Sequence, residues 1–200
     1  MRILIISAHP DDIELAMGGV LSRLKREDND IRVHVFSSSI TIQGNERIKD
    51  EVTASIRGIY GLDLSLHDFP TMHFHEHYQA IRDRIYDLKR KFSPNMVLTK
   101  SPNALHPDHR IIGEAVESIF LDTTIYAMEG VRDFHNQHIN KWWAFGEEDL
   151  NTKLRALECY KSQASRHYFD REMIKAMAVF RGGQVGIPFA EGFEVIREVW

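Results

Sequence analysis

Hydrophobic and polar positions alternate along this chain with two different periods, and the alternation predicts strands and helices in turn. Unbroken apolar runs such as Ile3-Leu4-Ile5-Ile6, and segments in which apolar and polar residues alternate one by one, are typical of strands. Between them, apolar residues recur every three or four positions, as in helices with one buried face. The expected strands are 3–6, 31–36, 62–69, 96–99 and 124–128, and the expected helices are 14–25, 46–60, 78–92 and 108–121. This order predicts an α/β fold whose mostly parallel sheet carries helices on both faces.

The last third of the chain is less regular. Its expected strands are 142–145 and 193–199, and its expected helices are 150–160 and 171–180, with a break at Gly182-Gly183. The sequence contains no internal repeat, no low-complexity tract and no linker rich in Pro, Gly or Ser. We therefore expect a single domain over residues 1–200.

Composition narrows the classes of partner. The chain has 25 basic and 29 acidic residues and a net charge of -4, which disfavours nucleic acid because phosphate binding needs a basic face. Cys159 is the one cysteine, so no intramolecular disulfide can form. No apolar stretch reaches the roughly 18 residues of a membrane span, and no signal peptide is recognised, so we expect a cytoplasmic protein. A homo-oligomer is compatible with the sequence, which is silent on oligomeric state.

A cluster of metal-binding and acidic residues follows the first expected strand. His9-Pro10-Asp11-Asp12 lies at its C-terminal end, where ligands bind in open α/β sheets. His9 and Asp12 can face one point on a turn, and imidazole and carboxylate are ligands of zinc and similar ions. A bound divalent ion lowers the pKa of water toward ~7, and Asp11 could then accept its proton. Taken alone, the two carboxylates could instead cap the following helix.

A second cluster, His106-Pro107-Asp108-His109, follows another expected strand. The carboxyl ends of parallel strands point the same way, so the two clusters are expected to meet. His109 would complete a set of two His and one carboxylate, leaving open positions for water and substrate. His106 is then left over, and Asp108 is close enough to fix its tautomer or stabilise its charged form. A charged imidazole beside a metal would stabilise an oxyanion.

These motifs resemble the LmbE/PIG-L family of metal-dependent N-deacetylases. The resemblance rests on Ala8-His9-Pro10-Asp11-Asp12, Gly18-Gly19 and His106-Pro107-Asp108-His109. Tyr160-Lys161-Ser162-Gln163 and Ala190-Glu191-Gly192-Phe193 are similar to the family's C-terminal signatures, so the matches run from residue 8 to 193.

The resemblance implies a Rossmann-like three-layer sandwich and one divalent metal, zinc or ferrous iron. By motif position it implies His9, Asp12 and His109 as ligands. Asp11 would be the general base, and His106, assisted by Asp108, the oxyanion stabiliser.

The chain departs from the family pattern in three places. Glu usually follows the Asp pair directly, but here Ile13 intervenes before Glu14. Many members position substrate with an Arg after the second strand; Arg47 is the nearest candidate, although its spacing does not match cleanly. Where some members carry a Tyr before the second motif, this chain has Ala104.

Other polar and aromatic segments admit two interpretations. We interpret His73-Phe74-His75-Glu76-His77 as a solvated loop, with a second metal site or a pocket wall as the alternative. His135 and His138 lie in a polar stretch interpreted as a surface loop, with a substrate-selecting lid as the alternative. Trp142-Trp143 is assigned to the core rather than to sugar stacking. Gly18-Gly19 lacks the spacing of a dinucleotide fingerprint and is expected to allow close packing of a helix on a strand.

The sequence thus leads to one hypothesis and its rivals. We expect a metal-dependent hydrolase that removes an N-acetyl or similar N-acyl group from a small amino sugar or its conjugate, releasing amine and acetate. One rival is an enzyme of the same fold acting on a non-sugar amide. Another is a metal-stabilised binding module without turnover, against which the spare carboxylate of Asp11 argues.

Overall fold

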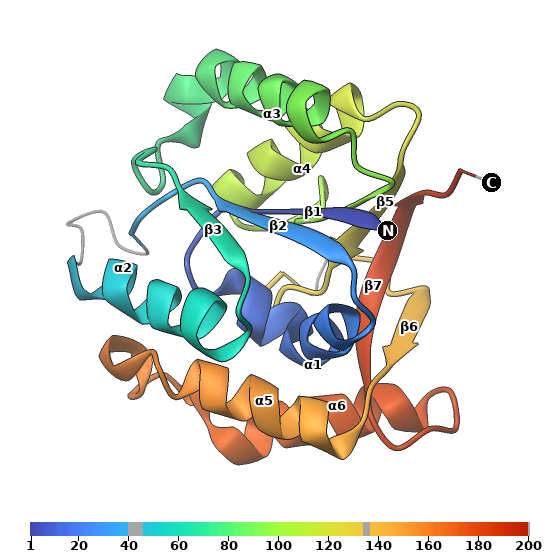
Figure 1. Cartoon of the computed structure of the whole chain (residues 1–200). Helices are drawn as coiled ribbons and strands as arrows, with labels where there is room; N and C mark the ends of the chain where they lie inside the picture. The colour runs from blue at the N-terminus through green and yellow to red at the C-terminus, as the bar shows by residue number, and fades with distance from the viewer. Residues whose placement is uncertain (40–45, 134–136, 200) are drawn as a thin grey trace.

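A seven-stranded sheet organises the molecule in the computed structural model, which describes residues 1–39, 46–133 and 137–199 (Figure 1). The strands are β1 (Arg2–Ser7), β2 (Asp30–Val35), β3 (Asp63–Leu66), β4 (Met96–Thr99), β5 (Thr124–Met128), β6 (Lys141–Ala144) and β7 (Ala190–Arg197). The helices are α1 (Asp12–Arg26), α2 (Glu46–Thr53), α3 (Tyr78–Phe92), α4 (Pro107–Ile119), α5 (Glu147–Leu157) and α6 (Arg171–Gly183).

The order of the strands in the sheet is β3-β2-β1-β4-β5-β7-β6. All pairings among the first five strands are parallel, and β7 runs antiparallel between β5 and β6. From β1 the chain proceeds to one side through β2 and β3, and then crosses to the other side through β4 and β5. The switch therefore falls between β1 and β4, and ligands bind at such a point in open α/β sheets.

Helices cover both faces of the sheet, as the sequence predicts. In Figure 1, α3 and α4 lie on one face, whereas α1, α2, α5 and α6 lie on the other. Each face of the sheet packs against its own apolar core. Strand β1 contributes Ile3 and Ile5 to one core and Leu4 and Ile6 to the other, so it is buried on both sides. This double burial explains why β1 reads as an unbroken apolar run rather than as an alternation.

Helix α1 is kinked, and a distant carboxylate supports its second half. Met17 has non-helical dihedral angles, φ -142° and ψ 25°. Just beyond the kink, the N–H groups of Gly19 and Val20 donate to the carboxylate of Glu191 on β7, at 3.1 and 2.7 Å. A Cβ on Gly18 would lie 2.7 Å from Tyr60 Oη and 2.8 Å from Lys153 Cγ of α5, and a Cβ on Gly19 would lie 2.7 Å from the ring of Phe145, which follows β6, so the pair allows close packing of α1. The hydrogen bonds from Gly19 and Val20 to Glu191 thus connect the Gly18-Gly19 pair with the C-terminal motif 190–193.

Most expected elements are confirmed, with three differences. The helix expected over 46–60 consists of α2 followed by a π-helix at Ala54–Ile59. Helix α6 continues through Gly182 and Gly183 instead of breaking before them. Trp142 and Trp143 lie on β6 and are only partly buried, and Trp143 packs against Phe193 with ring centroids 4.7 Å apart. Over the described ranges, no helix combines the length and the apolar character that crossing a membrane requires.

Candidate active site

The two His-Asp motifs meet at the carboxyl ends of β1 and β4. His9 lies in the turn after β1, and His109 lies in the first turn of α4, which follows the loop after β4. His9 Nδ1 is 3.1 Å from His109 Nε2, although the two residues are 100 positions apart. Parallel strands place both motifs at one edge of the sheet, and the start of each following helix turns its side chains inward.

Asp12 brings a carboxylate to the same point. Its Oδ1 is 3.1 Å from His109 Nε2, and its Oδ2 is 3.7 Å from His9 Nδ1. Ser7 Oγ and the backbone N–H of His9 both donate to Oδ2 at 2.9 Å, which fixes the carboxylate. Burial alone would raise the pKa of Asp12, but the charges of His109 and Lys100 hold it well below its usual value.

The outer nitrogen of each central imidazole is held by a second carboxylate. His9 Nε2 lies 3.0 Å from Asp108 Oδ2, and His109 Nδ1 lies 2.5 Å from Asp133 Oδ2. Burial opposes ionisation of Asp133, but its bond to His109 lowers its pKa to about 2. Metal-binding histidines in proteins make this kind of outer contact, which fixes the tautomer and orients the inner nitrogen.

The inner donor atoms fit a divalent ion. Zinc bonds of about 2.0–2.2 Å in a tetrahedron place the ligand atoms roughly 3.4 Å apart. His9 Nδ1 and His109 Nε2 are 3.1 Å apart, and each lies near a different oxygen of the Asp12 carboxylate, Oδ2 at 3.7 Å from His9 and Oδ1 at 3.1 Å from His109. Donor atoms of His9, His106 and His109 also lie within 4.8 Å of one another, so His106 is the alternative third ligand.

His106 and Asp108 interact differently from the sequence-based expectation. The Asp108 carboxylate contacts His9 Nε2 and accepts from the Met72 N–H at 2.7 Å, and no hydrogen bond joins it to His106 among the described residues. Instead, the backbone N–H of Asp108 donates to His106 Nδ1 at 3.2 Å, so His106 acts as the N-cap of α4. Burial, together with the nearby His109 and His9, lowers the pKa of His106 to about 4, although the charges of Asp108 and Asp12 act in the opposite direction. The expected charged imidazole is thus replaced by a neutral one whose proton is on Nε2.

Asp11 lies beside this cluster. Its side chain is 7% exposed, and its carboxylate has no hydrogen bond or ion pair within the described part of the chain. Burial raises the pKa of Asp11 to about 7, and the charges of Asp12 and Glu14 act in the same direction. A carboxylate with this pKa can take up and release a proton near neutral pH.

Lys100 is a site residue that the sequence did not single out. It follows β4 directly, is 2% exposed, and its Nζ lies 3.3 Å from Asp12 Oδ1. The ammonium compensates the buried carboxylate. A divalent ion bound to Asp12 would have to share that carboxylate with it.

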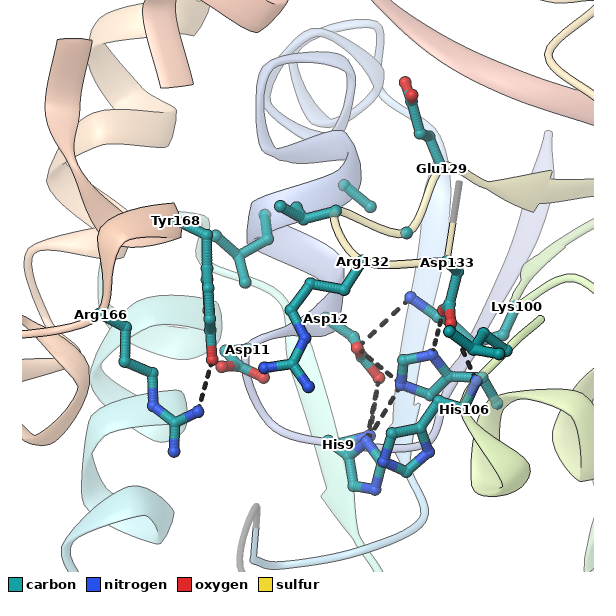
Figure 2. Close-up of a pocket in the computed structure, with 16 residues that line it drawn as sticks. His9, Asp11, Asp12, Lys100, His106, Glu129, Arg132, Asp133, Arg166 and Tyr168 are labelled. Atoms are coloured by element: carbon teal, nitrogen blue, oxygen red, sulfur yellow. Dashed lines mark hydrogen bonds and ion pairs between the residues drawn. The ribbon is translucent and has the colours of Figure 1, made fainter. Parts of the chain in front are cut away.

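These residues form one wall of a cleft with a volume of about 240 Å³. Arg132 and Asp133, after β5, and Arg166 and Tyr168, after α5, also line it, and Figure 2 shows them around Asp11 and the imidazoles. Arg47 does not line this cleft; it lies exposed on α2. Arg166 lies in an irregular segment without periodicity, so its place at the site had no signal in the sequence. The one signal for Arg132 was the polar stretch that it begins, for which a substrate-selecting lid was the alternative interpretation.

Tyr160, of the C-terminal signature 160–163, contacts the turn that carries the first motif, His9-Pro10-Asp11-Asp12. Tyr160 Oη lies 2.8 Å from the backbone oxygen of Pro10 and 2.7 Å from Glu14 Oε1. Ser55 Oγ also donates to Glu14 Oε1, at 2.5 Å. Burial raises the pKa of Glu14 to about 7. The contact of Tyr160 with Pro10 holds the turn that carries His9 and Asp11.

Within the described residues, no histidine other than His9, His106 and His109 lines the cleft. His73 and His75 are exposed beside Glu76, with His73 Nδ1 2.8 Å from Glu76 Oε1, and do not line the cleft. The polar stretch after β5 is more than a surface loop, because its first residues Arg132 and Asp133 line the cleft. His138 is exposed, and His135 lies outside the described residues.

Residues 4–120 match the model of the family described as PIG-L, GlcNAc-PI de-N-acetylase. The chain belongs to this family. The match covers both His-Asp motifs and the strands that carry them, β1 and β4. The family resemblance inferred from the motifs is therefore confirmed.

Individual relatives are distant but extend over the whole chain. Diacetylchitobiose deacetylase of Thermococcus kodakarensis is 22% identical over 232 residues, covering 100% of this chain and 84% of the relative. The structure of N,N'-diacetylchitobiose deacetylase from Pyrococcus horikoshii has a TM-score of 0.78 at 18% identity, covering 97% and 83% of the two chains. The 4-carboxy-2-hydroxymuconate hydratase GalB from Pseudomonas putida KT2440 has a TM-score of 0.82 at 17% identity, covering 100% and 97%. The fold is thus shared by a deacetylase and a hydratase, so the site residues must carry the functional argument.

Proposed function

We propose that this chain is a metal-dependent hydrolase that removes an N-acetyl or similar N-acyl group from an amino sugar or its conjugate. The observation that carries the proposal is the unpartnered, buried carboxylate of Asp11 beside an inward-facing donor set. A site that only held a metal for stability would need the donors but not this carboxylate.

His9, Asp12 and His109 are the residues proposed to hold the ion, zinc or ferrous iron. Their support is the three short separations between inner donor atoms and the outer contacts with Asp108 and Asp133. When bound there, a divalent ion would polarise a carbonyl oxygen and lower the pKa of water toward ~7.

The chain's own residues supply the proton chemistry. Asp11 accepts a proton from water, and its pKa of about 7 suits a base that works near neutrality. His106, with its proton on Nε2, donates a hydrogen bond to the oxygen that gains negative charge in the transition state. The proton held by Asp11 then passes to the departing amine, which leaves as a neutral group.

The substrate class rests on family membership and on the two diacetylchitobiose deacetylases. A panel containing N-acetylglucosamine, diacetylchitobiose and simple non-sugar acetamides, assayed for free amine and for acetate with added Zn²⁺ or Fe²⁺, tests it. We expect amine and acetate in equal amounts from a sugar substrate, and none after chelation of the metal.

Two outcomes would favour the rivals. Turnover of non-sugar acetamides alone would indicate an amidohydrolase of the same fold. Tight metal binding without release of amine or acetate from any member of the panel would indicate a binding module.

A further inference from the structure

Two arginines, Arg132 and Arg166, line the cleft without a hydrogen bond or an ion pair to any carboxylate within the described ranges. Arg132 makes no hydrogen bond or ion pair there. In the same ranges, Arg166 donates only to Tyr168 Oη, at 2.8 Å, and acts on the Asp11 carboxylate through its charge alone. The other strongly basic side chain of the cleft wall, Lys100, contacts Asp12.

Tyr168 brings the two guanidinium groups together. The Cζ atoms of Arg132 and Arg166 each lie 5.8 Å from the centroid of the Tyr168 ring. They come from separate segments, the turn after β5 and the loop after α5, and Figure 2 shows both side chains extending to the level of Asp11. The bond from Arg166 to Tyr168 Oη fixes one of them and leaves its other N–H groups free to donate.

The acidic groups of the cleft do not satisfy these arginines. Asp12 is held by Lys100 and His109, Asp133 by His109, and Glu129 by Arg181. Asp11 is the one acidic residue of the cleft lining without an ion pair, and it makes no hydrogen bond to either arginine in the described residues. Arginine forks match the geometry of carboxylate and phosphate oxygens, which they bind in pairs of hydrogen bonds.

We propose that Arg132, Arg166 and Tyr168 form an anion subsite, so that the amino-sugar substrate carries a carboxylate or phosphate group beside its N-acyl group. The anion lies between the two guanidinium groups, against Tyr168. The acyl group then reaches Asp11 and the imidazoles across the same cleft. This inference rests on the proposed hydrolase function, because it identifies the substrate of that site.

The first test compares neutral and anionic forms of one sugar. N-acetylglucosamine is the neutral probe, its 1-phosphate and 6-phosphate are the phosphate probes, and N-acetylmuramic acid is the carboxylate probe. We expect at least one anionic probe to exceed the neutral sugar about 10- to 100-fold in kcat/KM, mainly through a lower KM. The preferred probe then identifies the anion. Equal kcat/KM for all probes would overturn the proposal.

The second test uses Arg132→Gln, Arg166→Gln and the double variant. We expect each to raise KM for the anionic probe and so to remove much of its preference over the neutral sugar. The control is Arg90→Gln, which removes one charge from exposed α3, and should change neither value. If the arginines instead serve Asp11, neutral and anionic substrates will lose kcat equally, and the anion subsite is refuted.

A binding measurement separates this inference from the hydrolase proposal. Titration calorimetry of the same probes onto the unmodified protein, with and without added Zn²⁺, needs no turnover. We expect the preferred anionic probe to bind more weakly as NaCl is raised, and the double variant to lose this difference from the neutral sugar. Anion-selective binding without turnover would refute the hydrolase and keep the subsite. Turnover of neutral sugar without anion selectivity would do the reverse.

Discussion

At the scale of single residues, the two ring nitrogens of each central imidazole make different contacts. Each central imidazole turns one nitrogen toward the common point and places the other on a carboxylate, Asp108 for His9 and Asp133 for His109. Asp11 has no such partner among the described residues, and burial raises its pKa to about 7. In the proposed mechanism, His9 and Asp12 therefore bind the ion, and Asp11, between them in the same tetrapeptide, accepts the proton.

The ligand assignment predicts that one substitution weakens metal binding and that another leaves it unchanged. Asp12→Asn should weaken Zn²⁺ binding by about 100-fold or more, a larger loss than the 10- to 100-fold typical of outer contacts. His106→Asn should bind Zn²⁺ as the unmodified protein does while losing activity. Competition with a chromogenic chelator measures both. The reverse pattern would show that His106, not Asp12, is the third ligand.

The base assignment predicts a loss of rate without a loss of metal. Asp11→Asn should lower kcat by about 10²- to 10⁴-fold, because a general base contributes that much, and should keep the stoichiometry of the metal. Asp83→Asn on exposed α3 is the control and should have full activity. An Asp11→Asn protein whose kcat lies within a few-fold of the unmodified value would exclude Asp11 as the base.

At the scale of elements, the kink of α1 links the two ends of the chain. The helix that starts at Asp12 is interrupted at Met17, and the N–H groups exposed by the kink are bound by Glu191 of β7. Lys153 of α5 also contacts Glu191, at 2.6 Å, and both residues are about 4% exposed. A buried carboxylate at this position neutralises the ammonium and caps the second half of α1.

Removing this carboxylate should destabilise the fold. Glu191→Ala leaves Lys153 charged and unpaired in the interior, and breaking a buried pair in this way costs about 3–5 kcal/mol of unfolding free energy. Urea denaturation measures the loss. Glu172→Gln removes an exposed partner of Lys175 and should cost no more than about 0.5 kcal/mol. A loss below about 1 kcal/mol for Glu191→Ala would show that the kinked helix does not depend on this contact.

At the scale of the whole molecule, the edge of the sheet away from β7 carries an acid-sensitive pair. His34 of β2 lies with Nδ1 3.3 Å from Nε2 of His67, which follows β3. The pKa of each histidine is lowered to about 4, mainly by burial, and the charge of His67 contributes to the lowering at His34. Both are therefore neutral in the folded protein at pH 6, where the unfolded chain already binds protons, because a free histidine has a pKa near 6.5.

This difference predicts a specific pH dependence of stability. Between about pH 6.5 and 4 the unfolded state binds more protons at these two positions, so their contribution to the unfolding free energy falls as the pH falls. The slope of unfolding free energy against pH measures how many more protons the unfolded state binds than the folded state. In His67→Gln this number should fall by up to about one, measured by urea denaturation at several pH values. Asp11 and Glu14, whose pKa values are raised to about 7, act in the opposite direction, but equally in both proteins.

The control for this comparison is His75→Gln, because His75 is exposed on the surface. Its slope should equal that of the unmodified protein. The slope, rather than the absolute stability, is the test, since His67→Gln also removes ring packing against Phe36, whose centroid lies 4.7 Å away. An unchanged slope in His67→Gln would contradict the prediction.

The sequence by itself determined the elements and the meeting of the two motifs. Burial on one face or on both imposes a period on apolar positions, so β1, α3 and β4 follow from local pattern. The placement of His9 and His109 together follows from a general rule, because parallel strands end at the same edge. The motifs also pointed to the family that the match over residues 4–120 establishes.

Only the tertiary structure decided which side chains complete the site. The carboxylate of Asp108 lies on His9 rather than on its neighbour His106, because the start of α4 turns the two side chains in different directions. Arg132 and Arg166, rather than Arg47, line the cleft, because β5 and the loop after α5 end beside it. Periodicity reports the burial of a residue within its own element. Contacts between irregular segments depend on the order of strands in the sheet and on where each loop returns, which no local pattern encodes.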